Sequence, residues 1–389
     1  MTDRINESLA GRLESTAPRA LRFLGRRPPP RPGGSRPAQA RVGPPDDEDE
    51  RAIARKLRET MAARPRTREG PTGRDVAAEA DGIAAELVAR ARAVLAGLEG
   101  GASANSISGR DAVALEAVLH TRGRPALNVE GERIEDITDQ KHPGSGFWRV
   151  FIDTHEQALV RVASAAGAVT VLDRFTQQRW VQGTAWLIRP DLVVTNRHVL
   201  FPPVGLKLAR RNPGAMSARF KSDLEITIDF AFDAGPPRPS LRYPVVDIPF
   251  VAAESDPIDV GVIRIAPTAA VAASAPNPLT LANALFDSDQ LYVIGHPGKM
   301  DKIPQEVLAV FGTPDERKRV SFGELMDPLA NAAHIILHDA STIGGYSGGA
   351  VLGFRSQEVA ALHFFGDPIS GNRAISAPAL RAHPVAAFL

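Results

Sequence analysis

Short apolar runs separated by turn residues dominate this chain of 389 residues from Val169 onward. Nine runs can be picked out: AVTVLDR, WVQGTAWLI, LVVTNRHVL, LEITIDFAFD, VGVIRIA, QLYVIGHPG, AHIILHD, GAVLGF and EVAALHFFG. They are rich in β-branched residues and bounded by glycine, proline and aspartate, a pattern typical of many short strands in an all-β sandwich or barrel. The sequence therefore predicts a mainly β domain, to which we assign residues 151–389.

Residues 74–150 have a different, helical texture. DVAAEADGIAAELVARARAVLAGLEGG contains strong helix formers and ends in glycines suited to a helix C-terminus. DAVALEAVLHTRG predicts a second helix that ends at Gly123, and PALNVEGERIEDI predicts a strand, a turn at Glu130–Gly131 and a second strand or loop. DTHEQALVRVASAAG predicts a further helix leading into the β region. A helical module of this size is only marginally stable alone, so we expect it to pack on the rest of the chain.

Residues 1–73 have the composition of a disordered arm. Residues 26–49 combine proline, glycine and arginine with an acidic run, and they offer too little apolar surface to offset the entropy of ordering. Glu50–Gly73 is expected to form a loose helix at most. Four leucines fall near helical spacing among arginines: Leu9, Leu13, Leu21 and Leu24. They would suit a basic amphipathic helix for a membrane surface or a protein partner, whereas Pro18 favours a solvated arm.

Composition narrows the class of protein. The formal net charge is +1 and there is no cysteine, which excludes disulfides, thiolate zinc sites and a cysteine nucleophile. The lack of cysteine favours a reducing compartment, and MTDRINESLAGRLE lacks the apolar core of a signal peptide. No run is long enough to span a bilayer, so we expect a cytoplasmic protein without a transmembrane segment. Nucleic-acid binding is disfavoured, because prolines and acidic residues interrupt the arginine-rich arm and no aromatic residues alternate with the arginines.

Four glycines surround one serine in STIGGYSGGAVL, residues 341–352. A surface turn would explain them, since glycine tolerates positive φ. A nucleophile loop would explain them too, because glycines let backbone N–H groups converge beside an exposed hydroxyl. The stretch alone does not distinguish these alternatives. A nucleophile at Ser347 requires a general base elsewhere in the chain.

Candidates for that base and for its orienting carboxylate lie upstream. His198 follows an apolar run in GTAWLIRPDLVVTNRHVL, and Asp259 heads another in DPIDVGVIRI, with Asp256 as a competitor. A lone histidine after a strand is more often structural, and Asp259 alone would pass for an ordinary residue at a strand edge. The indicative feature is the order of the three motifs, T-x-x-H-V, then D-V-x-V-I-R, then G-Y-S-G-G.

From about Gly167 to the C-terminus, these motifs in this order resemble the trypsin-like (chymotrypsin-fold) serine peptidases of bacterial type. VIGHPG at 293–298 is similar to the V-x-G-x-P-G segment of that family. The resemblance implies a double β-barrel fold, here preceded by the helical module and the disordered arm. It also implies a serine endopeptidase acting on protein or peptide substrates.

The resemblance implies a role for each motif residue. His198 would be the general base, Asp259 would orient its imidazole, and Ser347 would be the nucleophile. The backbone N–H groups of Gly345 and Ser347 would form the oxyanion hole. Animal trypsins have an aspartate before the serine, and it pairs with a new N-terminal amine after cleavage. Tyr346 occupies that position here and cannot form the ion pair, so the usual zymogen switch is not expected.

The nucleophile loop resembles that of the glutamyl endopeptidase (V8-like) branch. In that branch a threonine five positions before the serine and a histidine on the following strand bind the P1 carboxylate. Thr342 and His363 are the matching positions, and Ser341 stands where a trypsin would have its acidic pocket residue. The resemblance thus implies Glu, Gln or Asp at P1. Alternatively, Thr342 caps a turn and His363 is a packed strand residue.

No metal or cofactor is expected. His334 and His338 would share one face of a strand, but they lack a third ligand and no HExxH motif is present, so a structural role is favoured. His296 is expected to do no more than occupy a turn. A competing hypothesis is a protein-binding or scaffold module on an inactive protease fold. The helical module and the N-terminal arm are candidate sites for a protein partner.

Overall fold

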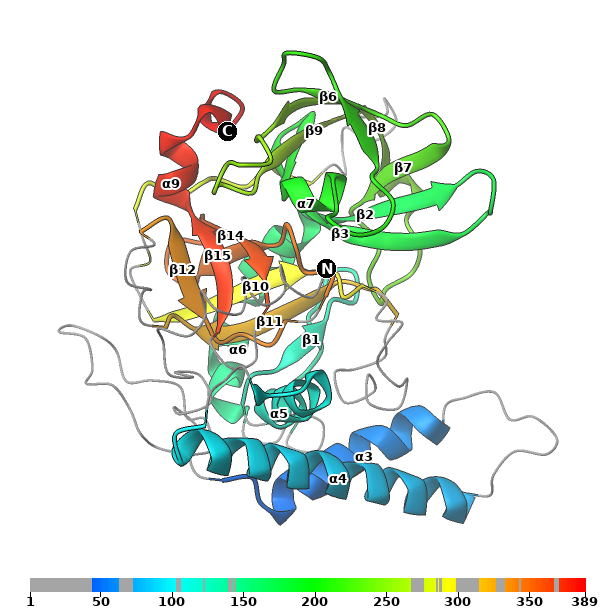
Figure 1. The fold of residues 1–389 in the computed structure, drawn as a ribbon, viewed down its shortest axis with the longest axis vertical. Helices are drawn as coiled ribbons and strands as arrows, with labels where there is room; N and C mark the ends of the chain where they lie inside the picture. Colours follow the sequence, from blue (N-terminus) through cyan, green and yellow to red (C-terminus); the bar gives the residue numbers. More distant parts are fainter. Residues whose placement is uncertain are drawn as a thin grey trace.

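Two antiparallel sheets make up most of the structure, and a group of helices lies below them in Figure 1. The computed structural model describes residues 44–62, 73–102, 106–121, 123–138, 142, 145–266, 276–284, 286, 289–298, 315–326, 333–342, 344–366 and 371–389. No helix in this part of the chain combines the length and the apolar character that a membrane span needs.

The first sheet is a closed barrel. Its strand order is β5-β6-β8-β7-β2-β3-β4-β9, and an additional pairing of β8 with β9 closes it. The strands are β2 (Ala166–Asp173), β3 (Arg179–Arg189), β4 (Leu192–Thr195), β5 (Ala209–Arg211), β6 (Ala218–Phe220), β7 (Leu224–Asp229), β8 (Arg242–Val251) and β9 (Gly261–Ile265). Apolar side chains fill its interior, because a closed sheet turns one face of every strand inward.

The second sheet is a half-barrel in the described residues, with the order β1-β11-β10-β13-β14-β15-β12. Its strands are β1 (Ala126–Asn128), β10 (Gln290–Gly295), β11 (Arg319–Glu324), β12 (Ile335–His338), β13 (Ala350–Gly353), β14 (Val359–Phe365) and β15 (Asn372–Ser376). Helix α9 (Ala377–Ala382) follows β15 near the C-terminus. The predicted mainly β, double-barrel fold is confirmed.

The segment before the barrels contributes to the second sheet. β1 pairs with β11, with Ala126 opposite Ser321, and Leu127 is fully buried. Helix α6 (Gly146–Ser164) buries Trp148 against Phe322, with ring centroids 5.5 Å apart. The boundary that we placed at residue 150 therefore falls inside α6. The apolar side chains of β1 and α6 belong to the same buried core as those of the barrels, so both elements pack with the barrels.

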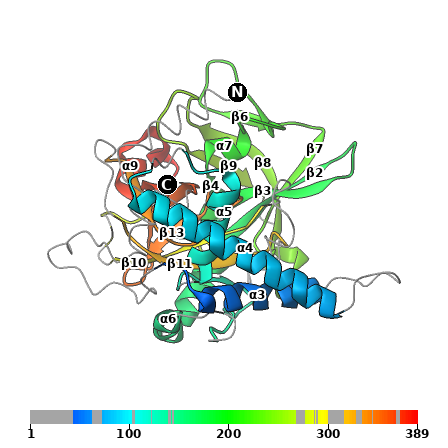
Figure 2. The same ribbon diagram turned by 60° about the horizontal axis from the view of Figure 1, so that its bottom comes forward.

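The helices α3 (Asp47–Ala62), α4 (Gly73–Glu99) and α5 (Gly109–Thr121) form a separate apolar cluster. Figure 2 shows α3 lying along α4. The expectation of disorder and of a loose helix at most is wrong for residues 47–62, because Ile53 and Leu57 are fully buried. Acidic residues in the first turn of α3 also suit the positive end of the helix dipole. Residues 1–43, with the leucine pattern, lie outside the described residues.

Leu57→Ala tests the packing of α3. We expect the substitution to lower the free energy of unfolding of the helical cluster by about 2–4 kcal/mol, because it leaves a cavity at a fully buried position. Urea unfolding followed by circular dichroism measures the change. Arg51→Ala, on the exposed face of α3, is the control and should change stability by less than about 0.5 kcal/mol. Equal stability of both variants would mean that α3 is a mobile arm after all.

Candidate active site

Ser347 lies where the two barrels meet, in the loop between β12 and β13. The backbone N–H of Thr184, in β3 of the first barrel, donates to the Ser347 carbonyl at 2.8 Å, and the Thr184 hydroxyl donates to the Gly345 carbonyl at 3.1 Å. A Cβ on Gly183 would lie 2.7 Å from Val199 and 3.1 Å from the Ser347 carbonyl. The bare backbone at Gly183 therefore lets the loop of one barrel approach the short helix that carries His198.

His198 is held by Asp259. It lies in helix α7 (Arg197–Leu200), directly after β4, and its Nδ1 is 2.5 Å from Asp259 Oδ2. The His198 backbone N–H donates to the other carboxylate oxygen at 3.1 Å, and Asn196 Nδ2 donates to the Asp259 carbonyl at 2.9 Å. Both oxygens of the carboxylate thus contact one residue. This leaves Nε2 of the imidazole for another partner.

The Asp259 carboxylate is stabilised in its ionised form. Burial acts to raise its pKa, but the hydrogen bond from His198 and the charges of His198 and Arg197 outweigh burial and hold the pKa below its ordinary value of 3.8. Asp256, the competitor, instead lies 2.9 Å from His383 Nε2 and accepts from the Ile258 backbone N–H at 2.9 Å. The structure therefore places Asp259, and not Asp256, against His198.

The nucleophile loop presents two unused backbone donors. The Gly344 carbonyl accepts from the Gly298 N–H at 2.6 Å, so the N–H of Gly345, across the trans peptide, points the opposite way. In the described part of the chain, neither this N–H nor that of Ser347 has a hydrogen-bond acceptor. Gly345 has φ +98°, and a Cβ there would lie 2.1 Å from the Gly298 nitrogen. Only glycine fits this position.

The Ser347 side chain is partly exposed, and its hydroxyl makes no hydrogen bond among the described residues. Catalytic hydrogen bonds are often long or poorly aligned before substrate binds, so this geometry is compatible with a nucleophile awaiting its base. His198 and Ser347 come from opposite barrels, and Gly183 is adjacent to both of their segments.

Tyr346 anchors the nucleophile loop. Its side chain is 2% exposed, and its hydroxyl lies 2.9 Å from the Ser321 hydroxyl on β11. Gly295 on β10 makes room for the ring, since a Cβ there would lie 2.5 Å from a ring carbon. Burial raises the pKa of the phenol to about 12. The sequence predicted only that Tyr346 cannot form the ion pair of the zymogen switch. In the structure, Tyr346 attaches the nucleophile loop to the core of the half-barrel.

Two buried hydroxyls lie just before the nucleophile loop. Ser341 Oγ and Thr342 Oγ1 have no hydrogen-bond partner in the part of the chain that the structure describes. His363, on β14, is also buried, and its Nδ1 is 3.1 Å from His338 Nε2. Burial, together with the charges of His338 and His198, lowers the pKa of His363 well below 6.5. His338 thus pairs with His363 and not with His334.

His296 does more than occupy a turn. It is fully buried, its backbone N–H donates to the Thr184 hydroxyl at 2.9 Å, and its carbonyl packs under Gly345. Burial and the charge of Lys318 lower its pKa well below 6.5. Sequence reasoning missed this support of the loop.

Among the described residues, no group of three or more His, Asp or Glu side chains is arranged to hold a metal ion.

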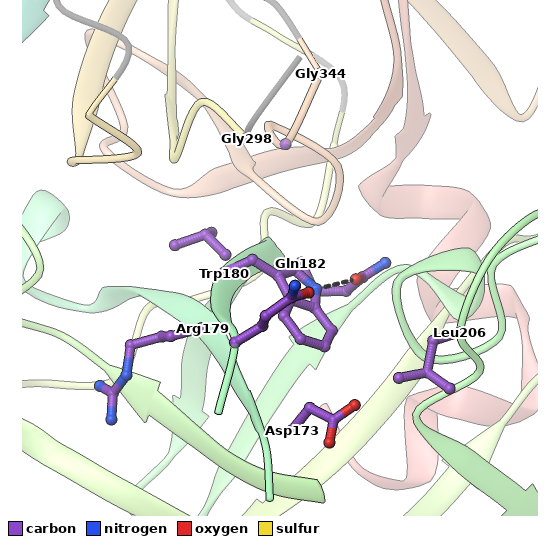
Figure 3. Close-up of a pocket in the computed structure, with 10 residues that line it drawn as sticks. Asp173, Arg179, Trp180, Gln182, Leu206, Gly298 and Gly344 are labelled. Atoms are coloured by element: carbon purple, nitrogen blue, oxygen red, sulfur yellow. Dashed lines mark hydrogen bonds between the residues drawn. The ribbon is translucent and has the colours of Figure 1, made fainter. Parts of the chain in front are cut away.

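A hollow of about 920 Å³ is lined in part by Gly344 and Gly345 of the nucleophile loop. Figure 3 shows Gly344 together with other residues of its lining. Its lining includes Asp173, Arg179, Trp180, Gln182, Leu206 and Gly298. Trp180 Nε1 donates to Gln182 Oε1 at 2.7 Å, the bond drawn as a dashed line, and this leaves the Gln182 amide nitrogen as a donor. Sequence reasoning missed this hollow, for which the only signal is the WVQ sequence just before Gly183.

Residues 183–362 match the family model of the trypsin-like peptidase domain. The matched trypsin-like peptidase domain begins at Gly183, ends within β14 and contains His198, Asp259 and Ser347. The comparison with curated proteins gave no match.

Several solved protease structures are similar to the chain at low identity. The active form of the Rv3671c protease from M. tuberculosis is 13% identical, with a TM-score of 0.37 over 58% of this chain and 81% of that chain. A serine endoprotease from Yersinia pestis is 18% identical, with a TM-score of 0.35 over 57% and 62%. Neuropsin, a serine protease of mouse brain, is 13% identical, with a TM-score of 0.39 over 59% and 96%.

Proposed function

We propose that this protein is a serine endopeptidase that hydrolyses peptide bonds in protein substrates. The observation that carries the proposal is the 2.5 Å contact between His198 and Asp259 beside a glycine-rich loop with two unused N–H donors. A serine hydroxyl is a weak nucleophile without a base, and His198 Nε2 is the free nitrogen of a fixed imidazole. The match to the trypsin-like peptidase domain supports the same chemistry.

Each group has a defined task in the proposed reaction. Ser347 Oγ attacks the scissile carbonyl carbon while its proton passes to His198 Nε2, and the negative charge on the carbonyl oxygen is stabilised by the N–H groups of Gly345 and Ser347. The imidazolium, stabilised by the ionised Asp259, then gives this proton to the leaving amine as the C–N bond breaks. A water molecule, deprotonated by His198, hydrolyses the acyl-enzyme and restores the serine.

We assign the hollow in Figure 3 to the substrate chain beside the oxyanion hole. Gly345 is part of its lining, and Gln182 offers an amide donor for a peptide carbonyl next to the indole of Trp180. We infer further that the enzyme prefers an acidic or glutamine residue at P1. Ser341 and Thr342 supply buried hydroxyls without partners, and His363 supplies an imidazole, a set suited to a carboxylate or an amide.

A matched pair of peptides with Glu or Gln at P1 tests this preference through pH. Burial keeps His363 neutral in the free enzyme, whereas a bound carboxylate favours its protonated form, so binding of the Glu peptide takes up a proton. As the pH rises from 6 to 8, KM for the Glu peptide should therefore rise relative to the Gln peptide, by up to about tenfold per pH unit. In His363→Gln the ratio should not change with pH. A constant ratio in the wild type, or clear cleavage after Arg or Leu, would sink the assignment.

Labelling with a fluorophosphonate probe tests the proposed function itself. The probe reacts with activated serines, so the wild type should be labelled and Ser347→Ala should not. The alternative is a binding or scaffold module on a protease fold. That alternative predicts a folded wild type that is neither labelled nor able to cleave a protein substrate.

A further inference from the structure

A buried ionic cluster joins the segment upstream of the barrels to the region of the nucleophile loop. Arg124 lies between α5 and β1 and is 2% exposed. Its Nε and Nη2 donate to the two carboxylate oxygens of Asp339 at 2.9 and 2.8 Å, and Nη2 also donates to Glu324 Oε2 at 3.1 Å. The proposed peptidase reaction uses none of these three residues.

The geometry of this cluster fixes the Asp339 carboxylate. The planar guanidinium engages both oxygens, which sets the orientation of the carboxylate as well as its distance. Asp339 Oδ1 also accepts from the Glu324 backbone N–H at 2.7 Å, and the Asp339 N–H donates to the Glu324 carbonyl at 3.1 Å. Asp339 is thereby attached to the end of β11 through its backbone and its side chain together.

The chain that follows Asp339 carries the proposed P1 pocket. Ala340, Ser341 and Thr342 come directly after it, and the last two present the buried hydroxyls without partners. Ala340 is packed against Gly323, where a Cβ would lie 2.3 Å from the Ala340 nitrogen, and its carbonyl accepts from Asn372 Nδ2. The path of residues 340–342 therefore depends on where Asp339 is held.

We propose that Arg124 is a positioning residue of the substrate pocket, which it sets by holding Asp339. This inference rests on the proposed function. In animal trypsins the cation is the new N-terminal amine, which forms only after cleavage and pairs with the aspartate before the serine. In this chain Tyr346 occupies the position of that aspartate. The guanidinium of Arg124 reaches the half-barrel with the chain intact, and β1, which follows it, lies between α5 and β11 (Figure 1). The segment just before β1 is thus part of the proposed enzyme, because it supplies the guanidinium that holds Asp339.

Arg124→Gln and Arg124→Lys, in the full chain, test the proposal. KM for the preferred P1 peptide should rise at least tenfold in Arg124→Gln, since a displacement of about 1 Å at a binding group costs on the order of 100-fold. The rate of fluorophosphonate labelling should change less than about threefold, because it depends on Ser347, His198 and the oxyanion hole. Arg124→Lys keeps the charge but loses the planar fork, so its KM should lie between those of the wild type and Arg124→Gln.

Arg242→Gln is the control for the loss of a guanidinium–carboxylate contact in itself, since it removes a more exposed guanidinium 2.9 Å from Asp229 in the first barrel, away from the pocket. It should leave KM unchanged. The proposal is overturned if folded Arg124→Gln has the wild-type KM, or if KM and labelling change only with the folded fraction measured by circular dichroism. Failure of both Arg124 variants to fold would make Arg124 a determinant of folding and would overturn it too. A wild type that is neither labelled nor active would instead refute the proposed function.

Discussion

Ser347→Ala and His198→Ala should each remove nearly all peptidase activity, and by similar factors, because the members of a triad act as a unit. Asp259→Asn should lower turnover by about 10⁴-fold, since asparagine keeps the size of the side chain but permits the wrong tautomer of His198. The comparison is made by turnover of one peptide substrate. Melting temperatures should stay close to that of the wild type, because no variant deletes a large buried apolar group.

Asp256→Asn is the matched control for Asp259→Asn. Asp256 contacts His383 and the Ile258 N–H, so its loss should affect the stability of the C-terminal segment while activity stays near that of the wild type. An inactive Asp256 variant beside an active Asp259 variant would show that the orienting carboxylate has been misassigned.

Gly345→Ala should lower turnover by about 10²–10³-fold, the loss measured when one oxyanion donor is removed. The new methyl group would lie 2.1 Å from the Gly298 nitrogen and 2.5 Å from the His296 carbonyl oxygen, at a residue whose φ is +98°. The loop must move to relieve this overlap, and the Gly345 N–H moves with it. Steady-state kinetics should show the loss in kcat more than in KM, because the oxyanion exists only in the tetrahedral intermediates and in the transition states that lead to and from them.

Gly298→Ala supplies the comparison on the other side of the same contact. A Cβ on Gly298 would lie 3.3 Å from the Gly345 Cα. Gly345 would have to move by only a few tenths of an ångström to relieve this contact, so Gly298→Ala should lower kcat much less than Gly345→Ala does. Equal losses in the two variants, or wild-type turnover in Gly345→Ala, would contradict the assignment of the oxyanion hole.

The role of Thr184 follows from the same geometry. Its N–H and hydroxyl hold the carbonyls of Ser347 and Gly345, and its hydroxyl accepts from His296. One residue of the first barrel thus fixes the loop of the second barrel. This role of Thr184 could not be predicted from the sequence, because nothing in GTAWLI indicates which remote carbonyls its side chain reaches.

The sequence by itself determined the class of fold and the motif residues. All nine apolar runs contain strands, since alternation and β-branching are local properties that report burial on a pleated surface. It missed other strands, among them β8, RYPVVDIPFV, which contains two prolines, and the short β5, ARR, which is mostly charged. Their pairing depends on distant partners and not on their own composition. The cytoplasmic location, the bacterial type and the V8-like specificity stay predictions.

Only the tertiary structure decided the arrangements that depend on remote partners. α3 was predicted to be part of a disordered arm because charged residues dominate its sequence. Its apolar residues Ile53 and Leu57 are identified as a packing face only by the structure, in which they pack with α4. The motif order favoured Asp259 over Asp256, and the structure shows the partner of each carboxylate: Asp259 contacts His198, whereas Asp256 contacts His383, near the C-terminus. Nothing in the sequence around Arg124 indicates its carboxylate partners, because the chain brings them together only when β1 pairs with β11. A local pattern reports what a segment prefers, whereas the partner that satisfies a buried charge is chosen by the packing of the whole chain.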